Sequence, residues 1–476
     1  MAMLFQRLFD ARLAQASYLL GCTRTKQALV VDPNRDLAQY ERAAAAEGLR
    51  ITHVTETHIH ADFVSGSREL ARRTGAQLLL SDEGGEGWRY AFAAEAGATL
   101  LKDGATFLVG DLRIDAVHTP GHTPEHLMFL VADTTVSPEP VGALTGDFVF
   151  VGDVGRPDLL ERAAQQVGTM EAGARQLFRS LRRLDALPDW LQLWPGHGAG
   201  SACGKALGAL PQTTLGWERR SNWALLETDE ARFVEAVLAG QPAPPTYFAR
   251  MKAINRDGPP PAPSLAMPRE ASLDEVAAAL ARGDTVLDLR PTAEYARGHL
   301  PGSLSIPLNK SFTTWAGWLV VPDRALWLVG DAAAAQAAAR ELALIGVDTV
   351  MAALPVAALD AWQARGGELA RMPQTTPAEL AARLGDGVFV VDVRNASEYA
   401  AGHLPGVPNI PLGELPQRVG EIPRDRPVVV HCQGGGRSAI AASVLEGQGI
   451  PNAVNLEGGY GRWALEGHPV ERPAAD

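Results

Sequence analysis

Long apolar segments are missing from this sequence of 476 residues. A membrane-spanning helix needs roughly 18 to 20 consecutive apolar residues, and no run in the chain reaches that length. The first residues, MAMLFQRLFDARLAQASYLLG, also have no long apolar stretch followed by small residues at a cleavage site, which a secretory signal would need. We therefore expect a cytoplasmic protein with no membrane span.

Cysteine and positive charge are also scarce. The three cysteines, Cys22, Cys203 and Cys432, lie far apart, which argues against a disulfide framework and leaves reactive thiols as an option. Cys22 adjoins a strand-like apolar run and is expected to be buried and inert. Lysine and arginine number 43 against 55 acidic residues, so the formal charge is −12. This charge disfavours nonspecific nucleic-acid binding and favours a small-molecule substrate.

The chain is too long for a single hydrophobic core, so its length predicts several domains. Two proline-rich breaks, at 258–268 (GPPPAPSLAMP) and 366–377 (GGELARMPQTTP), divide it into three parts. We expect domains over residues 1–255, 270–368 and 375–472. In the first part, strand-like runs alternate with a helical stretch, a pattern typical of α/β layers. The strand-like runs are 28–31, 51–55 and 78–80, and the helical stretch is 36–49.

The second and third parts are an internal repeat. VLDLRPTAEYARGHLPGSLSIPL from Val286 and VVDVRNASEYAAGHLPGVPNIPL from Val390 share the frame D-x-R-x-x-x-E-Y-x-x-G-H-L-P-G. Each copy continues into an apolar strand and an alanine-rich helix, from Leu326 and from Val428. The repeat predicts a small parallel α/β domain that is used twice.

Histidine and aspartate recur in the first part where apolar runs end. Four motifs, THIHAD, TPGHT, LTGD and PGHG, carry His58, His60, Asp62, His122, Asp147 and His197. For any one motif, a buried hydrogen-bond partner or a cap is the simpler explanation. The four motifs together favour a transition-metal site, because imidazole and carboxylate groups are the ligands that such metals require.

These motifs resemble the metallo-β-lactamase superfamily over about residues 3–250, and the resemblance implies an αββα sandwich. The usual motif of that superfamily is H-x-H-x-D-H, and Phe63 stands here in place of its last histidine. That histidine belongs to the second of two metal sites. Its loss leaves Asp62 and His197 as the remaining ligands of that site, so the resemblance favours a single metal.

Within the superfamily, the sequence is similar to a bacterial branch of persulfide dioxygenases that are fused to rhodanese domains. FVGDVGRPDLL from Phe150 and PGHGAGSACG after Trp194 carry this likeness. It implies one mononuclear Fe(II) per chain, held by two histidines and one aspartate in a facial triad. Carried over residue by residue, the ligands are His58, His122 and Asp147, while His60, Asp62 and His197 orient ligands and water around them.

Cys203 and Arg156 are candidates for the substrate pocket of this domain. A structural thiol is the simpler interpretation of Cys203, with a sulfur acceptor as the alternative. For Arg156, pairing with Asp153 or Asp158 is the simpler interpretation, and substrate contact is the alternative.

The third part contains VVVHCQGGGRSA, in which Cys432 follows an apolar strand and precedes three glycines, Arg437 and a helix. Backbone N–H groups at the N-terminus of a helix stabilise a thiolate or persulfide, and Arg437 adds a positive charge. A buried free thiol is the alternative. The remaining residues of the predicted persulfide cradle are Gln433, Gly434, Gly435, Gly436 and Ser438.

The loop and the blocks DVR and EYAAGHLPG of the third part resemble rhodanese, a sulfurtransferase that carries sulfur as a cysteine persulfide. Phosphatases with a Cys-to-Arg cradle have five intervening residues where this loop has four, so the shorter loop favours sulfur over phosphate. Asp392 and Arg394 are expected to brace the fold. The fold class implied for the whole chain is α/β, with two rhodanese-like domains after the sandwich.

The first copy of the repeat lacks the reactive residues. When the two strands are aligned without gaps, Gly330 stands opposite Cys432 and Ala335 opposite Arg437. We therefore predict an inactive pseudo-rhodanese domain that acts as a scaffold, with ligand binding as the alternative.

Together these features predict an enzyme that oxidises a low-molecular-weight persulfide, such as glutathione persulfide, with O2 to sulfite. Cys432 would transfer sulfur in the same pathway and give or use thiosulfate, so that the chain detoxifies sulfide. A zinc hydrolase resembling glyoxalase II and a noncatalytic sulfur carrier or sensor are the alternatives. The resemblance also suggests a homodimer, because members of the superfamily often associate.

Overall fold

The computed structural model describes residues 2–159, 168–201, 203–205, 207–241, 244–451 and 453–472. The chain forms two compact units, Met1–Ser264 with Ala343–Gly346, and Leu265–Leu342 with Val347–Asp476. The boundary after Ser264 lies inside the first proline-rich break, whereas helix α8 (Tyr247–Asp257) continues past the predicted domain end at residue 255. Among the described residues, no helix has the length and apolar character needed to cross a membrane.

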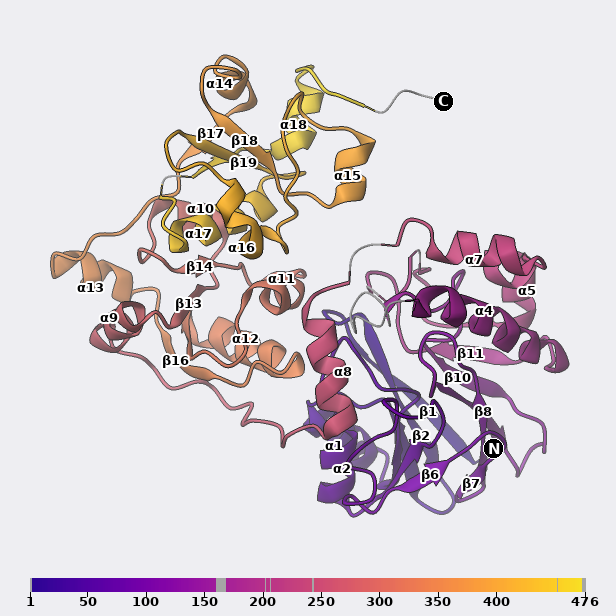
Figure 1. The fold of residues 1–476 in the computed structure, drawn as a ribbon. Helices are drawn as coiled ribbons and strands as arrows, with labels where there is room; N and C mark the ends of the chain where they lie inside the picture. The colour runs from indigo at the N-terminus through magenta and orange to yellow at the C-terminus, as the bar shows by residue number, and fades with distance from the viewer. Residues whose placement is uncertain are drawn as a thin grey trace. The chain divides into compact units, whose positions relative to one another are not determined.

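The first unit contains two six-stranded sheets (Figure 1). The first sheet has the spatial order β1 (Met3–Asp10), β2 (Gln15–Cys22), β3 (Gln27–Val31), β4 (Arg50–Thr55), β5 (Gln77–Ser81) and β6 (Thr99–Leu101). Strands β1 to β3 pair antiparallel, and β3 to β6 pair parallel. The strands predicted from the sequence are β3, β4 and β5, and the predicted helix is α1 (Leu37–Ala46), so these predictions are confirmed.

The second sheet of this unit is also mixed. Its spatial order is β12 (Thr213–Thr214), β11 (Gln192–Pro195), β10 (Gly142–Gly146), β9 (Leu127–Asp133), β8 (Leu112–His118) and β7 (Thr106–Val109). Strands β10 and β11 pair in parallel, and the other neighbours pair antiparallel. Further helices are α2 (Ser67–Thr74), α4 (Thr169–Leu181), α5 (Leu215–Ser221), α6 (Trp223–Leu226) and α7 (Glu230–Leu238).

The side chains of β2 show how the layers are held. Tyr18 packs into the core between the two sheets, whereas its neighbour Leu19 packs on the other face with Tyr40 of α1, because successive strand residues point to opposite faces. The outer face of the second sheet is covered in the same way by α4 and α7, which contribute Leu177 and Phe233. These layers confirm the predicted αββα sandwich.

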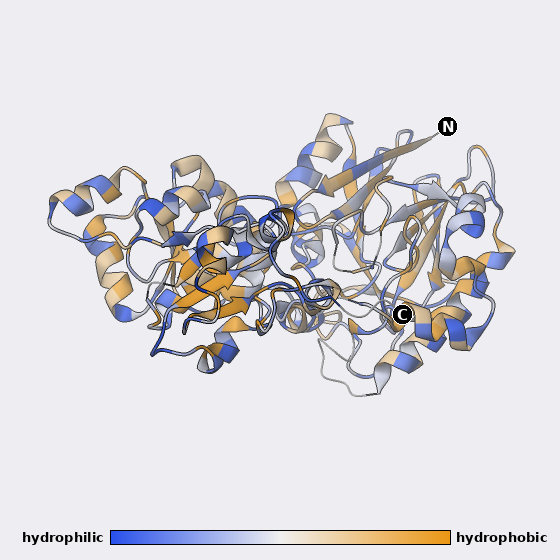
Figure 2. Cartoon of the chain, turned by 90° about the horizontal axis from the view of Figure 1, so that it is seen from above, coloured by the Kyte–Doolittle hydropathy of each residue, from blue (hydrophilic) through white to orange (hydrophobic). Residues whose placement is uncertain are grey.

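The second unit contains two four-stranded parallel sheets, one for each copy of the repeat. The first copy comprises α9 (Leu273–Arg282), β13 (Thr285–Asp288), α10 (Thr292–Arg297), β14 (Leu304–Ser305), α11 (Phe312–Leu319), β15 (Leu326–Val329), α12 (Ala332–Leu344), β16 (Val350–Leu354) and α13 (Ala358–Ala364). Its strand order is β14-β13-β15-β16. In Figure 2 strands of this unit are hydrophobic, while the surrounding helices carry both hydrophilic and hydrophobic residues, as expected for sheets buried between helices.

The second copy has the strand order β17-β20-β19-β18. It comprises β17 (Gln374–Thr375), α14 (Pro377–Ala381), β18 (Phe389–Asp392), α15 (Ala396–Ala401), α16 (Leu415–Arg418), β19 (Val428–His431), α17 (Gly436–Gly447), β20 (Val454–Leu456) and α18 (Gly459–Leu465). The two predicted parallel α/β domains are therefore confirmed.

The copies differ where the second carries its cysteine. Between β19 and α17 lie the four residues from Cys432 to Gly435, whereas only Gly330 and Asp331 separate β15 from α12. Ala335 therefore lies deeper in its helix than Arg437 does, and the ungapped alignment is wrong beyond the strand. The first copy lacks the loop as well as the cysteine and the arginine.

Candidate functional site

Three side chains from separate loops of the first unit converge on one point. Nε2 of His58 lies 3.9 Å from Oδ2 of Asp147, and Nε2 of His122 lies 3.5 Å from the same oxygen. All three residues are buried. Neither carboxylate oxygen of Asp147 bonds an N–H or O–H donor among the described residues. Because a buried anion without donors is costly, this cluster fits a bound cation, and the donor set suits a transition metal.

Hydrogen bonds fix which ring nitrogen each histidine presents. Thr57 Oγ1 donates to Asp32 Oδ2 at 2.9 Å, so it accepts from Nδ1 of His58, which lies 2.9 Å away. His122 donates from Nδ1 to the carbonyl oxygen of Arg156 at 3.0 Å. In both rings Nε2 is left with its lone pair facing Asp147, which is the form that binds a metal.

Burial also keeps these rings neutral. It lowers the pKa of His58 well below the ordinary value, and the neighbouring histidines, His60 first among them, lower it further. Burial likewise lowers the pKa of His122. Metal binding therefore does not have to displace a proton from either ring near pH 7.

A second group of ligand-type atoms adjoins the first. His197 donates from Nδ1 to the carbonyl of Ala14 at 3.1 Å, and its Nε2 lies 3.3 Å from Oδ2 of Asp62 and 3.6 Å from Oδ1 of Asp147. The ligand atoms of Asp62, His197 and Cys203 all lie within 4.8 Å of one another. Burial, together with the carboxylates of Asp62 and Asp147, raises the pKa of the Cys203 thiol well above its ordinary value. The structure thus places Cys203 where a third ligand atom beside Asp62 and His197 would lie.

His60 bonds Asp32, a residue that belongs to neither group of ligand-type atoms. Its Nε2 lies 3.0 Å from Oδ1 of Asp32, and its ring packs on Phe63 with the centroids 4.4 Å apart. Burial disfavours the charged ring, but the carboxylates of Asp32, Glu56 and Asp62 together outweigh burial and raise the pKa of His60 to about 9. Asp32, which orients both Thr57 and His60, was not predicted from the sequence. Its position directly after the apolar strand β3 and before Pro33 could have indicated it.

Arg156 lies in the segment that joins the two groups. Its guanidinium donates to both carboxylate oxygens of Asp158 at 2.7 Å, and it is fully buried. Its carbonyl holds His122, and its backbone N–H donates to the carbonyl of Cys203 at 3.3 Å. The structure therefore shows the predicted pairing with Asp158, and the segment positions His122 and Cys203 relative to each other.

In the second unit, the loop before α17 surrounds a sulfur atom. Sγ of Cys432 accepts a hydrogen bond from the backbone N–H of Gly435 at 3.1 Å and lies 3.4 Å from the hydroxyl oxygen of Ser438, which donates to Oδ1 of Asn455 at 2.6 Å. Gly435 has φ of 94°, a left-handed conformation that glycine adopts without steric cost. The backbone N–H of Gly435 and the N-terminus of the helix stabilise negative charge on this sulfur.

Arg437 is paired with a carboxylate that the sequence analysis missed. Its guanidinium donates two hydrogen bonds to Glu398, at 2.6 and 2.7 Å, and this contact raises the pKa of Arg437. Glu398 is the glutamate of the frame that the two copies share. Its presence in this frame could have indicated the residue in the sequence. The positive charge beside Cys432 is thus already matched, so anion binding there depends mainly on the backbone.

Asp392 and Arg394 form a separate buried pair below the loop. Nη2 of Arg394 donates to Oδ2 of Asp392 at 2.6 Å and to the carbonyl of Gly402 at 2.7 Å. Its Nη1 also lies 3.4 Å from Oε1 of Gln433. These contacts connect strand β18, the repeat frame and the loop 432–435 before α17, which is the bracing role expected from the sequence.

The Glu398–Arg437 pair allows a test of this loop. The substitution Glu398→Gln leaves Arg437 without its charged partner, and we expect it to lower the free energy of unfolding by about 1 kcal/mol, because the pair is partly exposed. Glu294→Gln is the matched control, since Glu294 holds the same frame position and has no arginine partner among the described residues. Urea denaturation measures both. Equal losses in the two variants would contradict the assigned role of the pair.

Comparisons with known proteins agree with this architecture. The metallo-beta-lactamase superfamily model matches residues 11–197, and the rhodanese-like domain model matches 272–353 and 376–466. The crystal structure of a metallo-beta-lactamase from Staphylococcus aureus subsp. aureus COL is 42% identical, with a TM-score of 0.70, and the match covers 75% of this chain and 100% of that one. The chain belongs to the metallo-beta-lactamase superfamily. It is a superfamily member fused to two rhodanese-like domains.

Curated relatives match the two parts separately. A sulfurtransferase of Allochromatium vinosum is 41% identical over 96 residues, which is 20% of this chain and 90% of the relative. The mitochondrial persulfide dioxygenase ETHE1 of Bos taurus is 26% identical over 199 residues, 41% of this chain and 68% of the relative. A hydroxyacylglutathione hydrolase of Rhodospirillum rubrum is 28% identical over 186 residues, 38% of this chain and 60% of the relative. The superfamily domain is thus similar to both a dioxygenase and a hydrolase.

Proposed function

We propose that the metallo-beta-lactamase domain is a persulfide dioxygenase with one Fe(II), held by His58, His122 and Asp147, and that the second rhodanese domain moves sulfur on Cys432. The observation that carries this proposal is the buried set of two neutral histidines and one carboxylate without donors. Such a set leaves coordination positions free for a sulfur ligand and O2. The rhodanese sulfurtransferase domain on the same chain supports a sulfur compound as substrate.

When bound at this cluster, Fe(II) would supply the activation of O2 that side chains do not provide. The chain supplies the rest. Thr57 and the Arg156 carbonyl keep the histidine rings in their metal-binding orientation. Oδ2 of Asp62 and Nε2 of His197, 3.3 Å apart, form a site that holds the proton lost when the persulfide binds as its anion. Burial of the cluster excludes bulk water.

The two reactions balance as a pair. In the first, R–S–SH, O2 and water give R–SH, sulfite and two protons. In the second, the Cys432 thiolate attacks the outer sulfur of another R–S–SH, the S–S bond breaks, and R–S leaves with the electron pair and takes the proton. Sulfite then attacks the outer sulfur on Cys432, so that thiosulfate leaves and the thiolate returns. The backbone N–H of Gly435 and the N-terminus of α17 stabilise that thiolate, and the reverse transfer uses the same groups.

One observation favours a second candidate, a two-metal hydrolase acting on a glutathione thioester. Asp62, His197 and Cys203 adjoin the first cluster and share Asp147 with it, so two cations would have ligands on both sides of that carboxylate. Metal ions held there would supply an activated water for cleavage of the thioester. The rhodanese partner gives no reason for this reaction, which is why we place it second.

Metal analysis together with oxygen uptake separates the two candidates. We expect one iron per chain, O2 consumption on glutathione persulfide, and no loss of iron in Cys203→Ser, because Cys203 is outside the proposed ligand set. Two metals per chain, loss of one of them in Cys203→Ser, and cleavage of a glutathione thioester would instead establish the hydrolase.

A further inference from the structure

The inactive rhodanese copy is bonded to the active copy through α17, the helix that follows the sulfur-transfer loop (residues 432–435). Oε2 of Glu446, near the C-terminal end of α17, lies 3.0 Å from Nε2 of His299, and the Oγ of Ser443 accepts from the backbone N–H of Ser305 at 3.0 Å. These bonds hold α17 against the inactive copy, and residues of both copies line a cavity at the loop. Residues of the inactive copy therefore belong to the surroundings of the reactive sulfur.

A small cavity of about 270 Å³ opens on Cys432. One wall comes from the loop and Arg437, and the opposite wall comes from Asn309, Ser311 and Trp315 of the inactive copy. A cavity of this size accepts an inorganic sulfur species, but it lies below the range of about 300 to 1,000 Å³ that is usual for organic ligands. The organic part of a persulfide would have to extend beyond it.

A larger cavity of about 700 Å³ lies on the other side of the loop. Thr292, Gly434 and Gly436 border both cavities. A Cβ atom added at Gly434 or at Gly436 would meet nothing within 4 Å, so neither glycine is packed against a neighbouring group that would obstruct the rim. A bound molecule can therefore lie in the larger cavity with its sulfur reaching over the glycines to Cys432.

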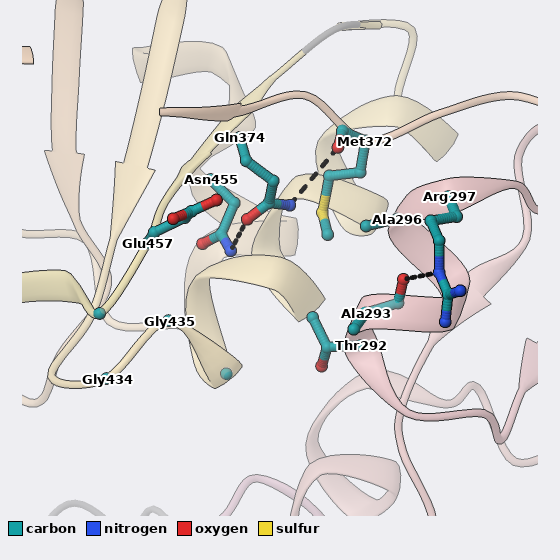
Figure 3. A pocket seen from close by; sticks show the side chains of 12 residues that line it. Thr292, Ala293, Ala296, Arg297, Met372, Gln374, Gly434, Gly435, Asn455 and Glu457 are labelled. Carbon is teal, nitrogen blue, oxygen red and sulfur yellow. Dashed lines mark hydrogen bonds between the residues drawn. The ribbon is translucent and has the colours of Figure 1, made fainter. Parts of the chain in front are cut away.

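The larger cavity carries opposite charges on opposite sides (Figure 3). Arg297, on α10 of the inactive copy, donates from Nε to the Ala293 carbonyl at 3.1 Å and has no carboxylate partner among the described residues. Glu457 lies on the active copy, where its ion pair with Arg462 has the long distance of 3.5 Å. Asn455, whose amide donates to Gln374 at 2.9 Å, lies near Glu457. A ligand with a carboxylate and an ammonium group would match this arrangement.

We propose that the larger cavity binds the organic part of the persulfide donor, and that this donor is a zwitterionic small thiol of the peptide class, such as glutathione. Arg297 binds the carboxylate of this donor, and Glu457 binds its ammonium group. The inactive copy thereby supplies specificity to the active one. This inference rests on the proposed sulfur transfer at Cys432 but not on the dioxygenase. In the step concerned, the Cys432 thiolate forms a bond to the outer sulfur, the donor S–S bond breaks, and the carrier leaves as the thiol.

The test compares two sulfur donors with the full chain, with cyanide as the acceptor. Because Cys432 is loaded in a first half-reaction, kcat/KM for the donor reports loading alone. In Arg297→Gln we expect the ratio of kcat/KM for glutathione persulfide to that for thiosulfate to fall about threefold to tenfold, mainly through KM. Arg324→Gln, at an exposed arginine that lines neither cavity, keeps the ratio of the wild type.

A second variant tests the ammonium site. Glu457→Gln should lower kcat/KM for glutathione persulfide but not for the persulfide of 3-mercaptopropionate, which has a carboxylate and no ammonium group. An unchanged donor ratio in Arg297→Gln, or equal losses with both persulfides in Glu457→Gln, overturns the inference. A wild type that takes no sulfur from glutathione persulfide at all would contradict the proposed transfer at Cys432 itself. This result differs from an unchanged donor ratio, which contradicts only the proposed binding of the donor in the larger cavity.

Discussion

In Cys432→Ser we expect thiosulfate formation from glutathione persulfide to fall by about 10³-fold or more, while oxygen consumption continues and sulfite accumulates. The loss is large because the serine cannot carry the sulfane sulfur, and removal of a covalent nucleophile acts on this scale. Sulfite should accumulate because the proposed site of its formation is in the other unit, whose candidate ligand cluster contains no residue of the rhodanese domain. Ion chromatography of both products, with an oxygen electrode, measures the change.

The control for this variant is Cys22→Ser. Cys22 is buried in the first unit, where its sulfur contacts Asp111 at 3.4 Å and takes no part in either candidate site. We expect it to retain both products. Thiosulfate formation that persists in Cys432→Ser would mean that another thiol carries the sulfur.

The second large effect is expected at the metal cluster. His122→Ala removes one of the three proposed ligands and leaves Asp147 buried with less compensation, so iron content and oxygen consumption should both fall by more than about 100-fold. Loss of groups that merely support a ligand already costs about 10- to 100-fold. Transfer of sulfur from thiosulfate to cyanide through Cys432 should persist in the same variant, which shows that the second unit is folded, and circular dichroism compared with the wild type checks the first.

The matched control is His53→Asn, on β4 just before the cluster. His53 bonds Thr52 at 2.9 Å and lies outside the ligand set, so its replacement should preserve iron and oxygen consumption. Full iron content and activity in His122→Ala would exclude the assigned ligand.

The sequence predicted those features that depend on short stretches of chain. Strands β3, β4 and β5 and helix α1 were predicted from local hydrophobic patterns. The two rhodanese copies were predicted from the frame that they share. The Cys432 loop was also readable, because its cysteine, glycines and arginine are consecutive. The Glu398–Arg437 pair was not found, since it joins residues 39 positions apart on two helices.

Helix α12 begins earlier than the ungapped alignment of the two copies implied, and the reason is its composition. The run DAAAAQAAAR consists mostly of the strongest helix former, and Asp331 caps it by accepting from the backbone N–H of Ala334 at 2.8 Å. The glycines after Cys432 have the opposite tendency and keep the longer loop open. A gapped comparison guided by helix propensity would have found this difference.

The place of Cys203 could be predicted only in part. Its short separation from His197 placed it near the pocket in the sequence analysis, whereas its proximity to Asp62 arises from the packing of loops that are distant in sequence. The loss of the histidine at Phe63 indicated a single metal, yet the structure brings a thiol into the group that the histidine would have joined. Metal analysis therefore has to determine whether the chain binds one metal ion or two.

The most direct test of the account is the stoichiometry of oxygen, persulfide and products with the iron-loaded chain. For the wild type we predict that one O2 and two molecules of glutathione persulfide are consumed for each thiosulfate formed. In Cys432→Ser, one O2 and one persulfide should give one sulfite. Consumption of persulfide without O2, or a chain that cleaves a glutathione thioester and takes up no O2, would contradict the proposed function.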